Sequence, residues 1–227
     1  MKPVPDQLAL DLPVEPRFGR EDFLVSPSNE KAFEHFERWP DWPARISLLL
    51  GPTGSGKSHL ASIWAERSGA AVAPASALSH INLPAFAEAG AVVVEDADRR
   101  LSAEHELFHL INMLLERGGF LVLTARTWPD AWGLATKDLL SRLRLAPAVE
   151  IGEPDDALIR AVLVKLFFDR QLVVDASVIE YLALRIERSL DAARGIVDSL
   201  DREALAQGRP VTRPMAAAVL RREGVTV

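Results

Sequence analysis

The chain has no cysteine among its 227 residues. This absence excludes disulfides, thiol catalysis and cysteine-ligated metal sites, and it suits the reducing cytosol. No apolar run is long enough to span a membrane, and residues 1–6 lack the apolar segment of a signal peptide. Positive charge is not in excess either: the net charge of −6 argues against a protein that mainly coats nucleic acid.

Hydrophobic residues make up 48% of the chain, enough for a substantial core. Short apolar runs alternate with helical patterns over the first two thirds of the sequence. The predicted strands are 46–50, 70–73, 91–95, 120–124 and 148–151, and the predicted helices between them are 58–67, 76–89, 103–117 and 137–143. Continuous apolar strands separated by helices indicate a parallel sheet that is covered on both faces.

The pattern changes at Gly152-Glu153-Pro154, beyond which only helical periodicity remains. These later helices are predicted at 155–169, 176–187, 190–207 and 212–223, and one earlier helix at 31–38. The sequence therefore predicts a flexible tail over 1–19, an α/β domain over 20–151 and a small all-helical domain over 152–227.

One segment matches the phosphate-binding pattern G-x-x-x-x-G-K-[ST] without a mismatch: Gly51-Pro52-Thr53-Gly54-Ser55-Gly56-Lys57-Ser58. A predicted strand precedes it and a predicted helix follows. Its glycines let backbone N–H groups approach phosphates, and the helix N-terminus favours negative charge. We expect Lys57 to reach the β- and γ-phosphates and Ser58 to ligate Mg²⁺. The alternative, a chance glycine-rich turn, does not explain this context, so these eight residues and His59 are predicted to bind a purine nucleotide.

Two acids, Glu95 and Asp96, end the apolar strand at 91–95. In phosphate-loop proteins this place holds Mg²⁺ and orients the attacking water, so Glu95 is expected on the metal side and Asp96 on the water side. The alternative is a strand that simply ends in acidic loop residues. Motor-type ATPases carry Asp and then Glu; the reversed order displaces both carboxylates and predicts weak hydrolysis. Thr124 ends the next strand, either as a sensor of the γ-phosphate or as a backbone cap.

In order and spacing, these motifs resemble AAA+ ATPases of the DnaA branch, over residues 18–223. Asp138-Leu139-Leu140-Ser141-Arg142-Leu143 resembles the segment that carries the family's arginine finger, and Gly208-Arg209-Pro210-Val211-Thr212 resembles a turn in its lid. The resemblance implies an α/β fold, an AAA+ P-loop parallel-sheet domain followed by a small helical lid. It also implies ADP or ATP, with Mg²⁺, as the cofactor.

Within that branch the chain resembles the Hda group, the regulatory inactivators of DnaA. The initiator continues into a DNA-binding domain after its lid, whereas this chain ends at Val227. In addition, Gln7-Leu8-Ala9-Leu10-Asp11-Leu12-Pro13 resembles a peptide that binds the sliding clamp, with Gln7, Leu8, Leu10 and Leu12 as its contacts. The alternative is that these leucines fold back as an edge strand.

The resemblance implies an ADP-bound regulator in the cytoplasm that sits on the sliding clamp and promotes ATP hydrolysis by DnaA. Arg142 matches the arginine finger, which would act in trans on the γ-phosphoryl of the partner's nucleotide. Two alternatives are that Arg144 supplies the finger, and that Arg142 is a surface residue paired with Asp138. The resemblance is compatible with a homo-oligomer and with contact to DNA only through these partners, and it implies no membrane contact.

Three departures from the family pattern concern the γ-phosphate. Arg126 stands where the initiator has an acidic sensor, Asp191 stands where the lid arginine is expected, and the acids at 95 and 96 are reversed. Arg188 or Arg194, preferably Arg194, would replace the lid arginine as a nucleotide contact. Together these departures predict a site that holds ADP and hydrolyses ATP poorly.

Two other functions fit parts of the sequence. A self-sufficient AAA+ ATPase, such as a helicase loader, is the alternative within the enzyme class. A DNA-binding adaptor would use the basic residues near the C-terminus, although most such clusters are only solvated surface; these residues are Arg209, Arg213, Arg221 and Arg222.

Overall fold

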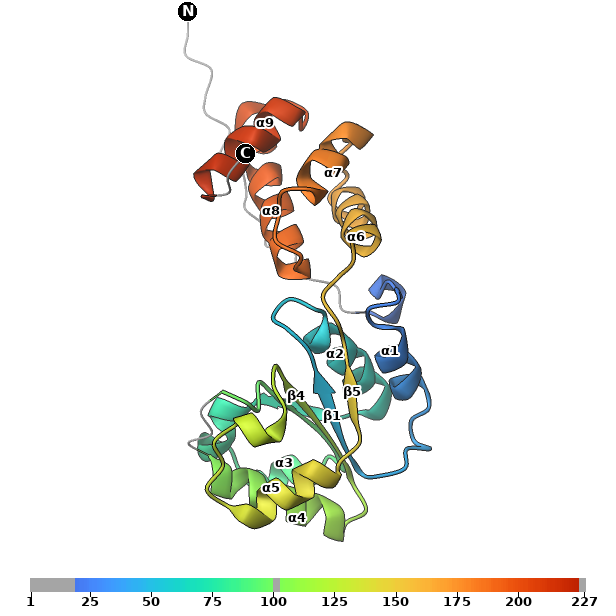
Figure 1. Ribbon diagram of the computed structural model, residues 1–227, viewed down its shortest axis with the longest axis vertical. Coiled ribbons are helices and arrows are strands. Elements are labelled where there is room, and N and C mark those ends of the chain that lie inside the picture. The colour runs from blue at the N-terminus through green and yellow to red at the C-terminus, as the bar shows by residue number, and fades with distance from the viewer. Residues whose placement is uncertain (1–18, 100–102, 225–227) are drawn as a thin grey trace, which may run out of the picture. The chain divides into compact units, whose positions relative to one another are not determined.

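Five apolar segments form one parallel sheet in the computed structural model, which describes residues 19–99 and 103–224 (Figure 1). The strands are β1 (Ile46–Leu50), β2 (Ala71–Pro74), β3 (Ala91–Glu95), β4 (Phe120–Ala125) and β5 (Ala148–Glu150), in the order β2-β3-β4-β1-β5. The predicted strands are confirmed, and each boundary lies within one residue of the prediction.

Strand register brings the ends of the strands to one edge of the sheet. β1 lies between β4 and β5, with Leu50 opposite Ala125 on one side and Glu150 on the other. β3 pairs with β4 on its far side, with Val94 opposite Leu123. Because all pairs are parallel, the chain leaves β1, β3 and β4 at the same edge, where parallel α/β sheets place their ligand sites.

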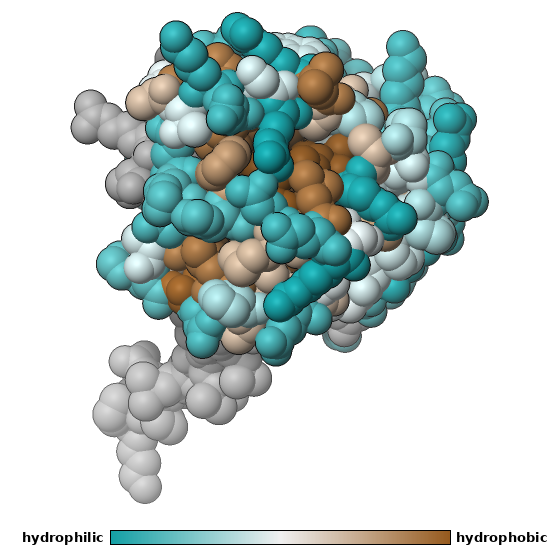
Figure 2. All heavy atoms as spheres, turned by 90° about the horizontal axis from the view of Figure 1, so that it is seen from below, coloured by the Kyte–Doolittle hydropathy of each residue, from teal (hydrophilic) through white to brown (hydrophobic). Residues whose placement is uncertain are grey.

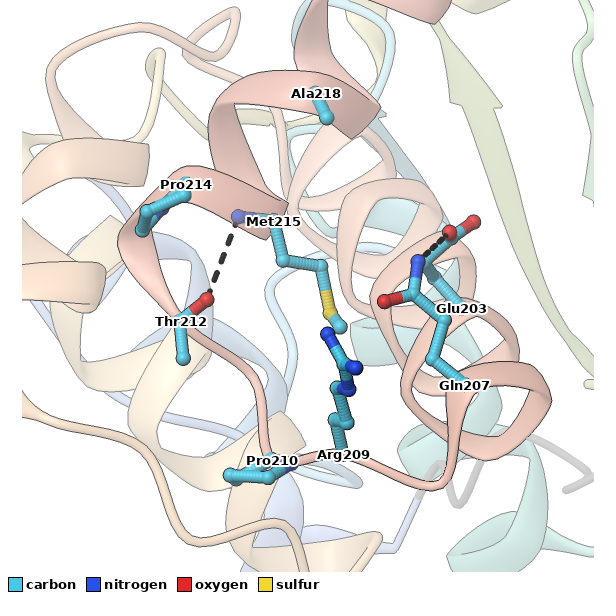
Figure 3. Close-up of a pocket in the computed structure, with 8 residues that line it drawn as sticks. All are labelled: Glu203, Gln207, Arg209, Pro210, Thr212, Pro214, Met215 and Ala218. Atoms are coloured by element: carbon cyan, nitrogen blue, oxygen red, sulfur yellow. Dashed lines mark hydrogen bonds between the residues drawn. The ribbon is translucent and has the colours of Figure 1, made fainter.

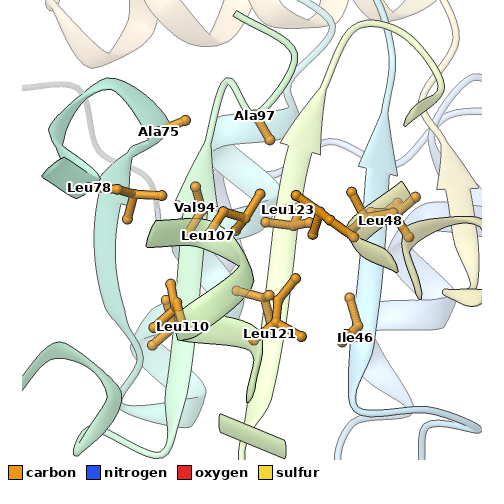
Figure 4. Close-up of a cluster of buried hydrophobic side chains, with 14 of the residues drawn as sticks. Ile46, Leu48, Ala75, Leu78, Val94, Ala97, Leu107, Leu110, Leu121 and Leu123 are labelled. Carbon is orange, nitrogen blue, oxygen red and sulfur yellow. The ribbon is translucent and has the colours of Figure 1, made fainter. Parts of the chain in front are cut away.

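Helices cover both faces of this sheet (Figure 1). On one face, α1 (Glu30–Glu37) and α2 (Lys57–Ser68) pack on strand residues such as Leu49, Val93 and Val122. On the other, α3 (Leu83–Ala87), α4 (Glu104–Glu116) and α5 (Lys137–Leu145) enclose a second core. Figure 4 shows that core, in which Val94 and Leu123 of the sheet lie near Leu107 of α4. Alternate strand residues thus build two separate cores, as expected for a sheet buried on both faces.

An aromatic cluster fixes the connection between α1 and β1. The rings of Trp42 and Trp64 stack with centroids 5.4 Å apart, and Trp39 meets Trp64 edge-on at 6.1 Å. Phe120 of β4 contacts both Trp39 and Trp42. The proline-containing segment 39–43, which ends α1, is therefore held by large apolar contacts with α2 and the sheet.

The prediction of one continuous helix at 76–89 is wrong. The chain instead forms a short 3-10 helix, Ala75–His80, and then α3. The Asn82 side chain accepts a hydrogen bond from the Ala85 N–H at 3.2 Å, and Pro84 lies in the first turn. An N-cap followed by proline starts a new helix, so this segment cannot continue the earlier one.

The described residues divide into two compact units, 19–155 and 156–224. The second contains α6 (Asp156–Asp169), α7 (Ala176–Ala183), α8 (Leu190–Gln207) and α9 (Arg213–Arg222). Three of these helices match the prediction to within one residue at each end, whereas α7 stops four residues before 187. The Ser189 side chain caps α8, Gly208 ends it with φ 59°, and the Thr212 side chain caps α9.

The surface seen in Figure 2 is mostly hydrophilic, with some apolar side chains gathered near its middle. Leu145, Phe168 and Val173 are the most exposed large apolar residues of the described chain, at 84%, 80% and 90%. Single exposed apolar residues are common and assign no function by themselves. No helix in the described ranges combines the length and apolarity that crossing a membrane requires.

Candidate nucleotide site

The glycine-rich loop 51–56 connects β1 to α2, as the motif requires. The Gly51 N–H donates to the Ala125 carbonyl at 3.1 Å, which ties the start of the loop to the end of β4. A β-carbon on Gly51 would lie 2.4 Å from the Ile151 carbonyl oxygen, so no larger residue fits. Gly56 has φ 102°, and α2 begins at the next residue. The backbone therefore curls at the N-terminus of a helix, where N–H groups and the helix dipole attract anions.

Lys57 folds back over this loop. Its Nζ donates to the carbonyls of Gly51 and Pro52, each at 2.8 Å, and the residue is 7% exposed. These bonds hold the ammonium group above the loop, where a phosphate bound to the loop N–H groups would meet it. A phosphate oxygen is a stronger partner for an ammonium than a carbonyl is, because both groups are charged.

Ser58 and Glu95 lie in contact although 37 residues separate them. The Ser58 hydroxyl donates to a Glu95 carboxylate oxygen at 3.2 Å. Burial raises the pKa of the Glu95 carboxyl; the Ser58 hydrogen bond opposes this shift, Asp96 adds to it, and Lys57 opposes it. A hydroxyl beside a carboxylate is the oxygen pair that Mg²⁺ uses in phosphate-loop sites.

Asp96 follows Glu95 in an unusual backbone conformation. Its φ is 54°, a left-handed value that Asp tolerates better than most residues. Its carboxylate pairs with Arg99 at 3.3 Å, and its N–H donates to the Thr124 hydroxyl at 3.0 Å. The backbone contact predicted as one role of Thr124 is therefore present, while its role as a γ-phosphate sensor stays a prediction. Thr124 is 1% exposed and joins β3 to β4 at the ligand edge of the sheet.

Arg126 pairs with Asp98, an acid that is part of no motif in the sequence. Its Nε donates to an Asp98 carboxylate oxygen at 2.9 Å, and the Asp98 side chain is 3% exposed. The other Asp98 oxygen is buried and has no hydrogen-bond partner in the described structure. This pair joins the loop after β3 to the loop after β4. Because 28 residues separate the partners, no local pattern predicts it.

Two further residues of the predicted nucleotide site are buried, one on α2 and one in the loop. His59 on α2 is 6% exposed; its Nε2 lies 3.1 Å from the Gly19 carbonyl and its ring contacts Phe23 edge-on. Ser55 is 1% exposed, and its hydroxyl has no hydrogen-bond partner among the described residues. His59 thus supports the loop from the side of the segment before α1, and its role toward nucleotide stays a prediction.

Arg142 lies on α5 and contacts α4. Its Nη1 donates to the Asn112 side-chain oxygen at 2.7 Å, and its guanidinium lies 5.1 Å from the centre of the Phe108 ring. The pairing with Asp138 that the sequence left open is not among its contacts within the described residues. Arg144, the other candidate finger, is exposed and pairs with Asp130.

In the helical unit, both candidate lid arginines have acidic partners. Arg188 pairs with Asp156 at 2.9 Å, and Arg194 pairs with Asp191 at 3.2 Å. Asp191, which stands where the family's lid arginine is expected, thus forms an ion pair with Arg194, three residues later on the same helix. The contact of Arg194 with nucleotide stays a prediction.

A pocket of about 520 Å³ lies in the helical unit beside the turn between α8 and α9 (Figure 3). Its lining includes Glu203, Arg209 and Met215. Glu203 is already engaged by Arg222 and Gln207, and it is the one acidic residue of the lining. The pocket lacks a glycine-rich loop and is not the predicted nucleotide site.

The remaining predicted contacts, Gln7, Leu8, Leu10 and Leu12, lie outside the described residues. Within the described residues, the structure brings together the loop 51–58, Glu95, Asp96 and Thr124 at one edge of the sheet. It places Arg142 against α4 and Arg194 in the helical unit.

A nucleoside diphosphate with Mg²⁺ fits this edge of the sheet. Gly51 leaves room for no side chain at the loop, Lys57 holds an ammonium above it, and Ser58 and Glu95 present adjacent oxygens. These groups suit phosphates and a hard cation respectively. No group of three or more His, Asp or Glu side chains that suits a metal occurs in ranges 19–99 and 103–224, so phosphate oxygens and water would complete the coordination of Mg²⁺.

Among known proteins, the chain is similar to the DnaA initiator in sequence and in fold. No protein-family model matches the chain. The chromosomal replication initiator DnaA of Anaplasma marginale is 26% identical over 93% of this chain and 50% of the relative. The chain thus spans about half the length of the curated relatives it matches.

Solved structures of DnaA are also similar to this chain. Domain III of Thermotoga maritima DnaA superposes with a TM-score of 0.76 at 19% identity, covering 93% of this chain and 98% of that domain. A replication initiator DnaA bound to AMPPCP and single-stranded DNA gives 0.65 at 18% identity, covering 85% and 68%. The chain has the AAA+ fold of DnaA domain III, with its parallel sheet and flanking helices.

Proposed function

We propose that this chain is a cytoplasmic regulator of replication initiation, an ADP-bound AAA+ protein that promotes ATP hydrolysis by DnaA. The observation that carries the proposal is a contrast within one site. The groups that would hold the inner phosphates are complete, whereas the acids and arginines near the outer phosphate are paired with one another.

The inner-phosphate half of the site supports tight binding of ADP. Lys57 would exchange carbonyl contacts for phosphate oxygens, and the loop already curls around the N-terminus of α2. Ser58 and Glu95 offer oxygens to Mg²⁺. A neighbouring structure supports binding of an adenine nucleotide in general, since a replication initiator DnaA was solved with AMPPCP, an ATP analogue.

The ion pairs of the residues around the outer phosphate support slow hydrolysis of ATP. Asp96, which would orient the attacking water, has its carboxylate engaged by Arg99. Arg126 is likewise engaged by the buried Asp98 and is not free to stabilise charge. Misplacement of a catalytic group by about 1 Å can cost about a hundredfold in rate, so a site with these pairings would retain nucleotide rather than turn it over.

Arg142 is the residue proposed to act on the partner. Its contacts with Asn112 and Phe108 fix the guanidinium on the surface of α4 and use one of its five N–H donors. The remaining donors suit a γ-phosphoryl group, over which charge spreads in the transition state. We propose that docking of DnaA draws Arg142 away from Asn112 into the initiator's site.

Two further parts of the proposal come from the sequence. Gln7, Leu8, Leu10 and Leu12 would bind the sliding clamp, and Arg194 would contact the nucleotide from the helical unit after exchanging Asp191 for phosphate. Arg194 stays the candidate preferred from the sequence, and its partner Asp191 lies three residues away on the same helix at 3.2 Å.

The first test is the nucleotide that the purified protein retains and the rate at which it hydrolyses ATP alone. We expect bound ADP and slow turnover. Rapid turnover that is lost in Asp96→Ala would overturn the proposal in favour of a self-sufficient ATPase such as a helicase loader.

The second test is a reconstituted assay of ATP hydrolysis by DnaA on clamp-loaded DNA. Arg142→Ala is expected to reduce the stimulation by about 10³-fold or more, the range for arginine fingers, while clamp binding stays intact. Arg144→Ala is the matched control, two residues away on the same helix, and should stimulate normally. Full stimulation by Arg142→Ala refutes the finger assignment.

Clamp binding is tested separately. Simultaneous replacement of Gln7, Leu10 and Leu12 by Ala should abolish retention on immobilised clamp while leaving ADP binding unchanged. Retention equal to that of the unmodified protein would exclude the tail as the clamp-binding segment.

A further inference from the structure

Helix α4 carries two histidines one turn apart, on the side away from the core. The segment His105-Glu106-Leu107-Phe108-His109 has the pattern H-E-x-x-H, which places both imidazoles on one helix face. Leu107 and Leu110 of the same helix are buried in the core, whereas His105 and His109 are exposed.

The two rings converge on one point. Their Nε2 atoms lie 2.9 Å apart, the ring centroids are 4.2 Å apart and the ring planes are perpendicular. In this contact one Nε2 carries a hydrogen and donates it to the other. One metal-binding nitrogen of each ring, Nε2, therefore already faces the other ring across an exposed turn of helix.

From this geometry we propose that His105 and His109 form a binding site for a divalent transition metal ion, of the class of Zn²⁺ and Cu²⁺. Two nitrogens on a tetrahedral Zn²⁺ lie about 3.3 Å apart, given Zn–N distances of about 2.0–2.1 Å. The observed pair needs to open by only a few tenths of an ångström. The shared hydrogen moves to Nδ1 of its ring, which leaves both Nε2 lone pairs for the ion and both imidazoles neutral.

The ligand type selects the metal. Imidazole nitrogen suits Zn²⁺, Cu²⁺ and Ni²⁺, whereas Mg²⁺ and Ca²⁺ prefer oxygen ligands. No third His, Asp or Glu joins the pair in the ranges that the structure describes. The remaining coordination positions are therefore left to water, and the site lacks the third protein ligand of a zinc hydrolase.

The site also borders a second feature of α4. The Phe108 ring lies 6.3 Å from the His109 ring and 5.1 Å from the Arg142 guanidinium. A bound ion would fix His109 against Phe108. The inference itself rests on neither the nucleotide loop nor the role of Arg142, and it stands or fails separately from the proposed function.

The test is calorimetric titration of the full chain with Zn²⁺ in a buffer free of chelators and nucleotide, with Mg²⁺ in excess so that the oxygens of Ser58 and Glu95 are occupied. We expect one ion per chain. His105→Gln and His109→Gln should each weaken binding by more than about tenfold, since even a residue that only supports a metal ligand costs about 10–100-fold. His80→Gln is the matched control, another exposed histidine that lies outside α4, and should bind as the unmodified protein does.

Spectroscopy supplies a second readout. The electron paramagnetic resonance spectrum of the Cu²⁺-loaded chain should show nitrogen coupling from two imidazoles, and from one fewer in either variant. Because both histidines are exposed, the variants are expected to keep the circular dichroism spectrum of the unmodified protein. Unchanged Zn²⁺ affinity in His105→Gln or His109→Gln, or an equal loss in His80→Gln, would overturn the assignment.

Discussion

At the scale of single residues, Glu95 shows how a ligand site opposes stability. The carboxylate must be charged to bind Mg²⁺, yet burial and Asp96 raise its pKa. Unfolding places the same group in water, where its pKa is about 4.3. The folded protein is therefore destabilised by this charge at neutral pH, because the site is arranged for a cation.

Glu95→Gln is expected to stabilise the protein in the absence of Mg²⁺ and nucleotide. The pKa of Glu95 is raised on folding, so its charge destabilises the native state fully above the folded pKa and not at all below the unfolded pKa. The gain in melting temperature should thus be largest at pH 7–8 and should vanish as the pH falls below about 4. Thermal melts at several pH values measure it.

The exposed Glu66 on α2 is the control for the loss of one negative charge. Glu66→Gln should not reproduce the gain at neutral pH. The same stability for Glu95→Gln and the unmodified protein at pH 8 would contradict the electrostatic account.

Residue patterns predicted one part of the site and not the other. The loop 51–58 is contiguous, and parallel strands place Glu95 beside Ser58 at the shared edge. The pairs Asp98–Arg126 and Asn112–Arg142 join residues 28 and 30 positions apart through side chains on different elements. Such contacts depend on how helices pack on the sheet, so no spacing in the sequence indicates them.

At the scale of elements, apolar runs located the strands, and the three inner strands β1, β3 and β4 are buried on both faces. The predicted helix boundaries were wrong where a capping side chain ends or starts a helix within a continuous apolar pattern. The side chain of Asn82 starts α3 inside an apparently continuous pattern, and Ser189 caps α8 after α7 has already stopped at Ala183. In both places a single local hydrogen bond decides the boundary.

Trp64 is expected to be the most important side chain for the packing of α2. It is 1% exposed and contacts Phe36, Trp39 and Trp42, which belong to α1 and the segment after it. Trp64→Ala should lower the free energy of unfolding by about 3–5 kcal/mol, the range for buried aromatic truncations. Urea denaturation followed by circular dichroism measures the change.

Trp128 offers the matched control, since it is 53% exposed. Trp128→Ala should change the free energy of unfolding by no more than about 0.5 kcal/mol. Equal losses in the two variants would contradict the role assigned to the aromatic cluster.

At the scale of the whole molecule, the chain consists of an α/β unit and a helical unit. The loop, Lys57, Ser58 and Glu95 all belong to the α/β unit. A ligand that binds only the folded state stabilises the unit that holds it. Thermal unfolding therefore reports which unit takes part in nucleotide binding.

ADP with Mg²⁺ at a hundred times its dissociation constant should stabilise the α/β unit by about 2.7 kcal/mol. For a domain of this size that raises the melting temperature by about 5–10 °C, as scanning calorimetry can measure. Lys57→Ala should lose most of this shift, whereas Lys31→Ala, an exposed lysine on α1, should keep it. A full shift in Lys57→Ala would place the nucleotide elsewhere.

The contact between Gly51 and Ile151 also limits how the chain can vary. A β-carbon added to Gly51 would lie 2.4 Å from the Ile151 carbonyl oxygen. That oxygen belongs to the backbone that follows β5, so it cannot move aside as a side chain could. Gly69, at the end of α2, has nothing within 4 Å of that place. In a saturation library selected only for folding, without nucleotide, codon 51 should already return glycine alone, while codon 69 should admit asparagine. Part of the binding motif would then be maintained by the architecture of the sheet, independently of any ligand.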